Sequence, residues 1–407
     1  MKILVVSQYY FPENFRINDL CKGLVERGHE VTVYTGLPNY PEGKLFQGYS
    51  FKGPYTEEID GIKVIRVPLI TRGAKKSFRL ALNYLSYFVS ATVLAPFLVK
   101  GEFDKIFVFA PSPITVAIPA LFLKFLKRAP VFLWVQDLWP ESLEATGVVR
   151  NKFILDKVGF GVKLLYKLTD KILLPSKAFI KNVKDLGAKD SQIVYFAQWS
   201  ESLFSNSPEE SSAIDPLIPK DGFKITFAGN IGTSQDFETI VKTAEILRNH
   251  KNIIFLILGN GLMRGWAESE VKRLGIEDTF IFLGSKPLEM MPYYYSKSDV
   301  MLLSLKDTPL FAVTVPAKFQ SYLASGKPIL ASVSGEVARI VNEYNVGISV
   351  PAGNANLLAE AVLKLKNSSP ETLRQMASNA KICHEENFER ETQIDLLEKI
   401  METTKFS

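Results

Sequence analysis

Glycine-rich segments follow three successive apolar runs in the second half of the sequence, and their chemistry suits an anionic ligand. The residues GNIGTS at 229–234 lie between an apolar run and a helical pattern, and GNG at 259–261 and GSK at 284–286 follow the next two apolar runs. A glycine-rich turn that enters a helix presents backbone N–H groups that bind phosphate oxygens. Because ligands of open α/β sheets bind at the carboxyl ends of the strands, these turns predict a nucleotide site.

Lys318 is a candidate phosphate-binding cation. In the segment VPAKFQSYLASGKP, Pro316 is predicted to begin a helix, which places Lys318 in its first turn. A cation beside a helix N-terminus opposes the helix dipole unless an anion also lies there. We therefore predict that Lys318 binds phosphate, with a solvated surface lysine as the alternative.

Polar side chains follow an apolar run in the first half. In the segment FLWVQDLWPES, Gln136, Asp137, Trp139 and Glu141 lie just beyond a predicted buried strand. An α/β active site is expected at this position. We predict that these residues contact a substrate; for Trp139, a packed turn before the following proline is the alternative.

Short apolar runs alternate with helical patterns along nearly the whole chain, which is typical of βαβ units and parallel sheets. We predict an α/β protein with two Rossmann-like domains and a cleft between them. The domains are an N-terminal domain at 1–197, a polar linker at 198–222, a C-terminal domain at 223–385, and a closing helix at 386–407, for which packing back on the first domain is one option. The predicted strands are 3–7, 30–35, 105–110, 131–136, 171–176 and 192–196, then 224–229, 253–259, 280–284, 300–304, 328–332 and 347–351.

The positive charge is concentrated in the first half. The 407 residues carry a formal net charge of +5, which divides into +10 over the first 200 residues and −5 over the rest. This asymmetry predicts two domains with different partners. No nucleic-acid-binding motif accompanies the charge, so nucleic acid is not an expected partner. Between Asp60 and Glu102 there is no acidic residue, and the basic residues there are Lys63, Arg66, Arg72, Lys75, Lys76, Arg79 and Lys100.

An uncharged segment at 80–99 lies within this basic stretch and is long enough to span a bilayer. Its asparagine, serine, threonine and proline residues argue against spanning, as do the predicted strands of one sheet on both sides of it. A second apolar run with basic residues follows at 114–130. Basic residues beside apolar helices suit peripheral attachment to an anionic membrane surface. Ordinary core helices with solvated basic ends are the alternative.

The cysteines and histidines indicate neither a disulfide framework nor a metal centre. Cys21 and Cys383 form no CxxC pair, and His29, His250 and His384 are scattered without ligand spacing. We therefore expect a reduced, cytoplasmic environment and catalysis without a metal.

Together these motifs resemble the retaining glycosyltransferases of family 4, which have the GT-B fold. The resemblance extends over essentially the whole chain and rests on YYFPE, ERGHEVTV, QDLWPES, AGNIGTSQDFE, ILGNG, FLGSKP and SYLASGKPILA followed by SGE. QDLWPES and VPAKF also resemble a branch of bacterial O-antigen and capsule clusters that includes N-acetyl-L-fucosamine transferases. The resemblance implies a UDP-sugar donor held mainly by the second domain, a polyprenyl-diphosphate-linked or oligosaccharide acceptor on the first, and no further cofactor.

The resemblance also assigns roles to individual residues. Ser285 and Lys286 would contact the nucleobase through their backbone, and Glu336 would lie near the ribose or cap a helix. The donor-binding candidates are Asn14, Arg16, Gly229, Asn230, Gly232, Gln235, Gly259, Asn260, Gly261, Arg264, Ser285, Lys286, Lys318 and Glu336. The catalytic candidates are Gln136, Asp137 and Lys318. The candidates for contact with acceptor or membrane are Arg72, Lys75, Lys76, Arg79, Trp139 and Glu141.

Several positions depart from the family pattern. Relatives usually have an arginine and a lysine in the phosphate loop, where this chain has Asn230 and Gln235. Val313 and Ser321 stand where two glutamates are expected. Residues 13–16 (ENFR) replace a glycine pair, and the arginine among them is either a substitute phosphate cation or an ordinary surface arginine.

Two other functions remain compatible with the sequence. A UDP-sugar 2-epimerase of the same architecture would convert a UDP-sugar without any acceptor. A non-catalytic nucleotide-sugar-binding protein would bind UDP without turnover. The retention expected of the family is explained by same-face attack with a phosphate oxygen as base, so we assign no catalytic carboxylate base.

Overall fold

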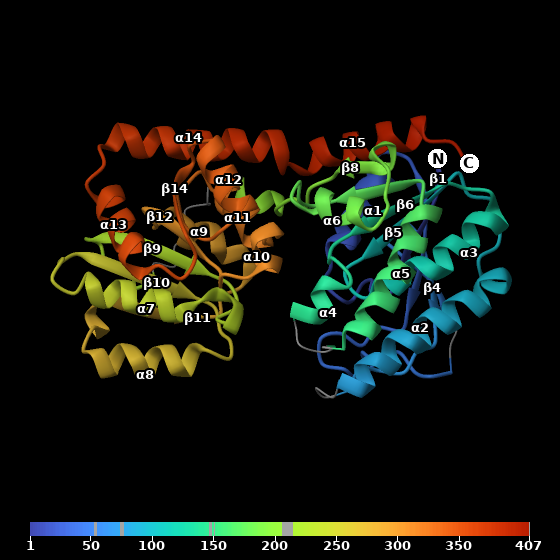
Figure 1. Ribbon diagram of the computed structural model, residues 1–407, viewed down its shortest axis with the longest axis horizontal. Coiled ribbons are helices and arrows are strands. Elements are labelled where there is room, and N and C mark those ends of the chain that lie inside the picture. The colour runs from blue at the N-terminus through green and yellow to red at the C-terminus, as the bar shows by residue number, and fades with distance from the viewer. Residues whose placement is uncertain (53–54, 74–76, 146–148, 150, 206–214, 407) are drawn as a thin grey trace. The chain divides into compact units, whose positions relative to one another are not determined.

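The computed structural model describes residues 1–407 except 53–54, 74–76, 146–148, 150, 206–214 and 407 (Figure 1). Its internal contacts divide the chain into two units. The N-terminal unit comprises Met1–Phe196 with Ile394–Ser407, and the C-terminal unit comprises Ala197–Gln393. Helix α15 (Arg390–Thr403) thus contributes most of its length to the N-terminal unit, where Glu398 forms ion pairs of 2.6 Å with both Arg27 and His29.

The N-terminal unit contains an eight-stranded sheet in the order β3-β4-β2-β1-β5-β6-β7-β8. All neighbouring strands are parallel except β3 and β4. The six parallel strands predicted from the apolar runs are therefore confirmed. The strands are β1 (Lys2–Ser7), β2 (Glu30–Gly36), β3 (Tyr55–Ile59), β4 (Ile62–Val67), β5 (Lys105–Ala110), β6 (Val131–Val135), β7 (Lys171–Leu174) and β8 (Ile193–Tyr195).

The sequence analysis missed the hairpin of β3 and β4 at the sheet edge. Every second residue of β3 is exposed, so this strand has no continuous apolar run. Asp60 and Gly61 join the two strands with φ of 51° and 77°. An Asp-Gly pair between alternating residues is a hairpin signal, and it was the feature that could have revealed these strands.

Helices α2, α3 and α5 lie side by side in the N-terminal unit, because α3 contacts both of the others (Figure 1). Residues 78–98 of α2 form the one helical stretch among the described residues that is long and apolar enough to cross a membrane by length and composition. The helices of this unit are α1 (Arg16–Glu26), α2 (Ser77–Leu98), α3 (Ala117–Lys127), α4 (Glu141–Ala145), α5 (Lys152–Leu168) and α6 (Phe179–Asp185), with α15.

The C-terminal unit contains a six-stranded parallel sheet in the order β11-β10-β9-β12-β13-β14. The strands are β9 (Phe223–Ala228), β10 (Ile253–Leu258), β11 (Phe280–Gly284), β12 (Val300–Ser304), β13 (Ile329–Ser332) and β14 (Gly347–Val350). The helices are α7 (Phe237–Ile246), α8 (Arg264–Leu274), α9 (Met291–Ser296), α10 (Pro309–Val313), α11 (Ala317–Ala324), α12 (Glu336–Glu343), α13 (Ala355–Lys366) and α14 (Pro370–Asn387). The predicted α/β class is confirmed in both units.

Each sheet has a point at which its strand order reverses. In the N-terminal unit β1 lies between β2 and β5, and in the C-terminal unit β9 lies between β10 and β12. Loops diverge at such a point, so ligands of doubly wound sheets bind beyond the carboxyl ends of these strands. The segments after β1, β2 and β5 and after β9, β10 and β12 are therefore the places to look for a site, and β6 lies next to β5.

Candidate active site

The carboxyl ends of β9, β10 and β11 meet through glycines in the C-terminal unit. The Gly229 N–H donates to the Leu258 carbonyl (2.9 Å), and the Gly259 N–H donates to the Gly284 carbonyl (2.8 Å). Gly229 and Gly259 have φ of 133° and 124°, a region that residues with a Cβ rarely adopt. A Cβ on Gly259 would overlap the Gly229 carbonyl oxygen. The predicted glycine turns thus lie side by side at one edge of the sheet.

Short side-chain contacts shape the two turns. The Gly232 N–H donates to the side-chain oxygen of Gln235 (3.1 Å), which closes the turn after β9. The Gly261 N–H donates to the side-chain oxygen of Asn260 (2.9 Å) in the turn after β10. A Cβ on Gly261 would lie 2.6 Å from the side-chain oxygen of Asn230, so the turns leave no room for a larger residue. Gln235 therefore braces the turn after β9, and neither Asn230 nor Gln235 can supply the positive charge of the usual arginine and lysine.

Lys318 occupies the first turn of α11, beside the turn that follows β9. Its ammonium Nζ is buried, and none of the described residues forms a hydrogen bond with it. Nζ lies 4.0 Å from the centroid of the Phe227 ring and 3.1 Å from the position that a Cβ on Gly229 would take. Burial lowers the pKa of Lys318 to about 7. A buried ammonium without a hydrogen-bond partner is unfavourable even over an aromatic ring, so burial of Nζ argues against the solvated alternative and favours an anionic ligand.

Two buried serines lie on the same sheet edge, and the sequence analysis missed them. Ser304 and Ser332 end β12 and β13 and are register partners in the sheet. Both hydroxyl oxygens are buried without a hydrogen-bond partner in the described part of the chain. Such groups are costly unless a ligand or water joins them. A serine that closes an apolar run, as in VMLLS and ILAS, is the signal that could have identified them.

Lys286 is held by an ion pair within the C-terminal unit. Its Nζ lies 3.1 Å from Asp215 Oδ2, and the Tyr294 hydroxyl donates to the same oxygen (2.9 Å). Hydrogen bonding with Tyr294 and with Asp215 raises the pKa of Lys286. The ammonium is therefore committed to Asp215. The assigned role of Ser285 and Lys286, which is contact with the nucleobase through their backbone, stays a prediction.

Arg264 and Glu336 begin helices and pair within them. Arg264 Nε donates to Glu268 (2.8 Å), and its Nη1 lies 3.5 Å from where a Cβ on Gly284 would be. The Glu336 side chain is 5% exposed and accepts from Arg339 Nη2 (2.8 Å) in the first turn of α12. A carboxylate there complements the helix dipole, but the cap residue of α12 is Gly335, and contact of Glu336 with a ribose stays a prediction. No three Asp, Glu, His or Cys side chains form a metal-binding group within the described residues.

In the N-terminal unit, Glu13 joins the loop after β1 to the loop after β2. Its Oε1 accepts from the backbone N–H groups of Asn39 and Tyr40, both at 2.8 Å. Burial raises the pKa of Glu13 to about 7. The neighbouring Asn14 is exposed, and Arg16 is half-buried at the start of α1. Glu13 thus has a positioning role that its place in the ENFR segment did not reveal.

Asp137 follows β6 at the carboxyl edge of the N-terminal sheet, as predicted. The Gln136 N–H donates to the Ala110 carbonyl (3.0 Å), which ties the end of β6 to the end of β5. Burial raises the pKa of Asp137 to about 6. Burial and, among smaller causes, the Asp137 charge raise the pKa of Tyr84 on α2. Asp137 is thus a half-buried carboxyl group that changes its charge near neutral pH.

Two of the basic residues predicted for acceptor or membrane contact, Arg72 and Arg79, lie in the described part of the chain. The Arg72 guanidinium lies 4.9 Å above the Tyr40 ring, and its Nη1 is 3.5 Å from the Tyr9 hydroxyl. Arg79 Nε donates to the Thr71 carbonyl (3.2 Å). Arg72 therefore lies beside two tyrosines, Tyr9 after β1 and Tyr40 after β2, whereas Arg79 holds the segment that precedes α2.

Trp139 and Glu141 lie at the start of α4, beside a cavity of about 620 Å³ on the N-terminal unit. Trp139 Nε1 and Glu141 Oε2 are buried without hydrogen-bond partners among the residues described. The other Glu141 oxygen accepts from Asn182 Nδ2 (2.9 Å). The cavity is lined by Pro140, Glu141, Glu144, Lys152, Leu155, Asp156, Gly159, Phe160, Lys163 and Leu186.

Comparison with known protein families matches both units of this chain. Residues 14–199 match the family described as "Glycosyl transferase 4-like domain", and residues 209–382 match "Glycosyl transferases group 1". The chain belongs to the family 4 glycosyltransferases. Its two parallel-sheet units are those of the GT-B fold, as the motifs predicted.

This glycosyltransferase has named relatives in bacteria. It is 26% identical over 258 residues to "Probable glycosyltransferase WbjE" of Pseudomonas aeruginosa, covering 60% of this chain and 63% of the relative. It is 25% identical over 346 residues to "Putative colanic acid biosynthesis glycosyl transferase WcaI" of Escherichia coli (strain K12), covering 80% and 82%. The chain therefore spans less than two thirds of the first relative and about four fifths of the second.

Solved structures share the fold of this glycosyltransferase. Anabaena Alr3699/HepE in complex with UDP aligns with a TM-score of 0.70 at 14% identity, over 99% of this chain and 100% of that chain. Sucrose-phosphate synthase from Thermosynechococcus elongatus aligns with a TM-score of 0.74 at 14% identity, over 99% and 98%. At this level of identity the likeness establishes the fold alone.

Proposed function

We propose that this glycosyltransferase transfers a sugar from a UDP-sugar to a lipid-linked or other glycan acceptor, in the synthesis of a bacterial surface polysaccharide. The observation that carries the proposal is the partnerless Lys318 ammonium beside the Gly229 turn. The UDP complex of HepE supports the donor class, and the description of WcaI supports the class of product. The first donor sugar to test is N-acetyl-L-fucosamine.

Glycosyl transfer breaks the bond between the sugar and the diphosphate, so negative charge grows on the leaving phosphate while the sugar becomes oxocarbenium-like. In our proposal Lys318 and the backbone N–H groups of the turn after β9 neutralise that charge, and preorganised groups of this kind are effective catalysts. Gln136 and Asp137 provide polar contacts to donor sugar or acceptor. Same-face attack with a phosphate oxygen as base gives a retaining, metal-independent route without a carboxylate nucleophile.

An assay with and without acceptor tests the proposed function. The enzyme is incubated with a panel of UDP-sugars, with or without a polyprenyl-diphosphate-linked sugar, and the products are identified by mass. We expect a product whose mass has grown by one sugar, formed only when acceptor is present. A UDP-sugar changed without acceptor would indicate a 2-epimerase, and UDP binding without any product would indicate a binding protein.

Replacing Asp137 with asparagine is expected to change the pH dependence of the reaction. The pKa values of about 6 for Asp137 and about 7 for Lys318 predict that kcat/KM rises through pH 6 and falls above pH 7. Loss of a buried charged contact lowers kcat/KM by about 10- to 100-fold and removes the rising limb. Initial rates from pH 5 to 9 measure both effects. A variant with normal turnover and an unchanged profile would remove Asp137 from the site.

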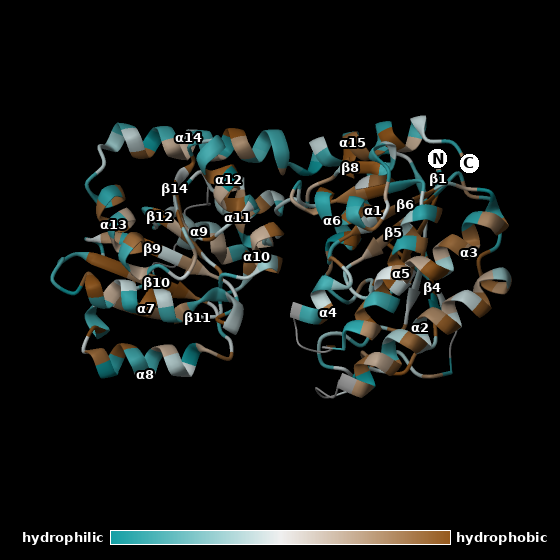
Figure 2. Cartoon of the chain, viewed as in Figure 1, coloured by the Kyte–Doolittle hydropathy of each residue, from teal (hydrophilic) through white to brown (hydrophobic). Residues whose placement is uncertain are grey.

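We also propose that the N-terminal unit attaches peripherally to the cytoplasmic face of a membrane. The exposed fractions of Phe97 (68%) and Phe160 (71%) support this attachment, and Figure 2 shows apolar residues along α2, α3 and α5. Lysines on the same helices would attract anionic lipid. Lys75 and Lys76, assigned to this contact from the sequence, lie outside the described residues. The apolar helix face comprises Phe78, Leu85, Val89, Val93, Phe97, Phe122, Phe125, Leu126, Phe153, Ile154, Phe160 and Leu164.

The double variant Phe97→Ser and Phe160→Ser is expected to lose most membrane binding, because it removes two of the most exposed aromatic side chains of the apolar helix face. Flotation with vesicles that contain phosphatidylglycerol, at low salt, measures the bound fraction. We expect at least a fivefold reduction, about 1 kcal/mol or more. The matched control is Ile246→Ser with Ile382→Ser on the C-terminal unit, both exposed. Equal flotation of the two variants would contradict the attachment.

A further inference from the structure

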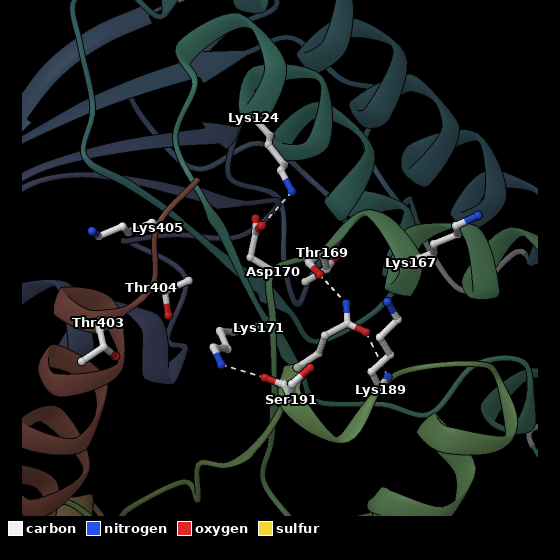
Figure 3. Close-up of a pocket in the computed structure, with 11 residues that line it drawn as sticks. Lys124, Lys167, Thr169, Asp170, Lys171, Lys189, Ser191, Thr403, Thr404 and Lys405 are labelled. Atoms are coloured by element: carbon white, nitrogen blue, oxygen red, sulfur yellow. Dashed lines mark hydrogen bonds and ion pairs between the residues drawn. The ribbon is translucent and has the colours of Figure 1, made fainter. Parts of the chain in front are cut away.

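A second cavity lies on the N-terminal unit (Figure 3). It has a volume of about 430 Å³ and lies at the amino end of β7, which begins with Lys171. Asp137, in contrast, follows the carboxyl end of β6. The cavity, called the basic pocket below, is lined by Lys124, Lys167, Thr169, Asp170, Lys171, Lys189, Ser191, Gln192, Thr403, Thr404 and Lys405.

The basic pocket is lined by five lysines and one carboxylate, and both oxygens of that carboxylate have partners within the protein. Asp170 Oδ1 lies 2.8 Å from Lys124 Nζ, and its Oδ2 accepts from the Val131 N–H (2.7 Å). Both side chains of the pair are nearly buried, at 6% and 4% exposure. Lys171 Nζ donates to the Ser191 carbonyl (2.7 Å). Lys124, Asp170 and Lys171 therefore hold the walls of the pocket together.

The other three lysines of the lining come from separate parts of the chain, and all three are exposed. Lys167 comes from the last turn of α5, Lys189 precedes β8, and Lys405 lies in the segment after α15 (Figure 3). The structure gives none of these three ammonium groups an ion pair among the residues it describes. Asp190, the residue after Lys189, pairs with Lys184 and not with any of these three lysines. The excess positive charge repels itself in this concave site, and an anion would relieve the repulsion.

The walls of the pocket are fixed in a shape that an anion can enter. Gln192 Nε2 donates to the Thr169 carbonyl (2.6 Å), which holds the turn after α5. Lys105 Nζ donates to the Thr404 carbonyl (2.7 Å), which fixes the segment after α15 against the start of β5. Lys405 is thereby held at the rim. These bonds fix the backbone around the pocket, while the exposed side chains of Lys167, Lys189 and Lys405 would become ordered when the anion binds.

We propose that the basic pocket binds the phosphate groups of a phosphorylated anion, at a site separate from the sugar-nucleotide site. Its volume and its three available ammonium groups suit a diphosphate, which carries more than one negative charge. The anion comes either from solution or from the head group of a lipid. A lipid head group is a possible source because the helices that line the pocket also carry exposed apolar residues. Helices α3 and α5 supply Lys124 and Lys167, and they also carry the exposed Phe125 and Phe160.

Calorimetry with inorganic diphosphate tests the proposal on the full chain at low salt, with saturating UDP present to occupy the sugar-nucleotide site. The pocket variant carries Lys167→Gln, Lys189→Gln and Lys405→Gln. We expect it to bind diphosphate at least tenfold more weakly than the wild type. The control variant carries Lys22→Gln, Lys63→Gln and Lys181→Gln, which remove the same charge from exposed positions of the same unit and should bind as the wild type does.

Flotation with vesicles distinguishes the two sources of phosphate. If vesicles of phosphatidylcholine with phosphatidylglycerol bind the pocket variant less than the control variant, the anion is a lipid head group. If both variants float equally while diphosphate binding differs, the anion is soluble. Equal diphosphate binding by both variants, or no diphosphate binding by the wild type, would overturn the proposal. If the triple pocket variant does not fold, the single variant Lys405→Gln replaces it, because Lys405 is exposed and lies outside every helix. This single variant must also bind diphosphate more weakly than the wild type does.

Discussion

Replacing Lys318 with methionine is expected to lower kcat/KM by about 100- to 1000-fold, because a preorganised charge on the leaving phosphate is lost. Methionine keeps an unbranched apolar side chain beside Phe227 and removes the ammonium, which lies 4.0 Å from the centroid of the Phe227 ring. The same change is expected to stabilise the fold by about 1 to 2 kcal/mol. An ammonium that is buried without a partner disfavours the folded state, and the variant no longer carries it.

The pH dependence of that stabilisation has a defined sign. The pKa of about 7 for Lys318 in the folded protein lies below the usual lysine value of 10.5, so the unfolded chain binds the proton more tightly. The cost of folding is therefore largest below pH 7 and disappears as the pH rises toward 10.5. Thermal unfolding at pH 6.5 and pH 9.5 should show a larger gain for Lys318→Met at the lower pH. Lys242→Met, at an exposed position on α7, is the control and should change neither turnover nor stability.

Among substitutions of alanine for a glycine of the site, Gly259→Ala is expected to have the largest effect on the structure. The new Cβ would overlap the Gly229 carbonyl oxygen, and a φ of 124° is a strained conformation for alanine. Relief requires the turns after β9 and β10 to separate. Because Lys318 Nζ lies beside Gly229, we expect at least a 100-fold loss of UDP affinity together with a loss of about 3 kcal/mol of stability.

Gly265→Ala is the matched control for that prediction. It adds the same methyl group six residues away, at the start of α8, where a Cβ would meet no atom within 4 Å. Alanine favours a helix more than glycine does, so this variant should be as stable as the wild type or slightly more stable. Chemical denaturation and UDP calorimetry measure both variants. If Gly259→Ala binds UDP as Gly265→Ala does, the packed glycine turns are not part of the donor site.

The sequence contained enough information to predict the parallel sheets and the sheet edges that carry the candidate site. Buried parallel strands appear as continuous apolar runs, and turns at their carboxyl ends follow directly from the chain order. Lys318 was also identifiable, because its position in a helix first turn is a property of the local sequence. The outer β3 and β4 pair was not found, since exposed strands lack such runs.

Contacts between distant segments could not be predicted. Glu13 is bound by backbone groups of Asn39 and Tyr40, and the partner of Lys286 is Asp215 from the polar linker segment. Clustered charge in the sequence also gave a misleading picture of the surface. Arg66 belongs to the basic stretch but is fully buried and paired with Glu57. Which charges face solvent depends on the packing of the strands around them, and linear spacing does not contain that information.

The number of protons taken up on UDP binding tests the role of Lys318 most directly. At pH 8 the free protein holds Lys318 largely uncharged, because its pKa is about 7. Pairing with a diphosphate raises that pKa, so binding must take up close to one proton at this pH. Calorimetry in two buffers of different ionisation enthalpy measures the number. We predict close to one proton for the wild type and none for Lys318→Met, with much weaker binding by the variant. Equal affinity and no proton uptake in both proteins would contradict the assignment of Lys318 to the donor phosphate.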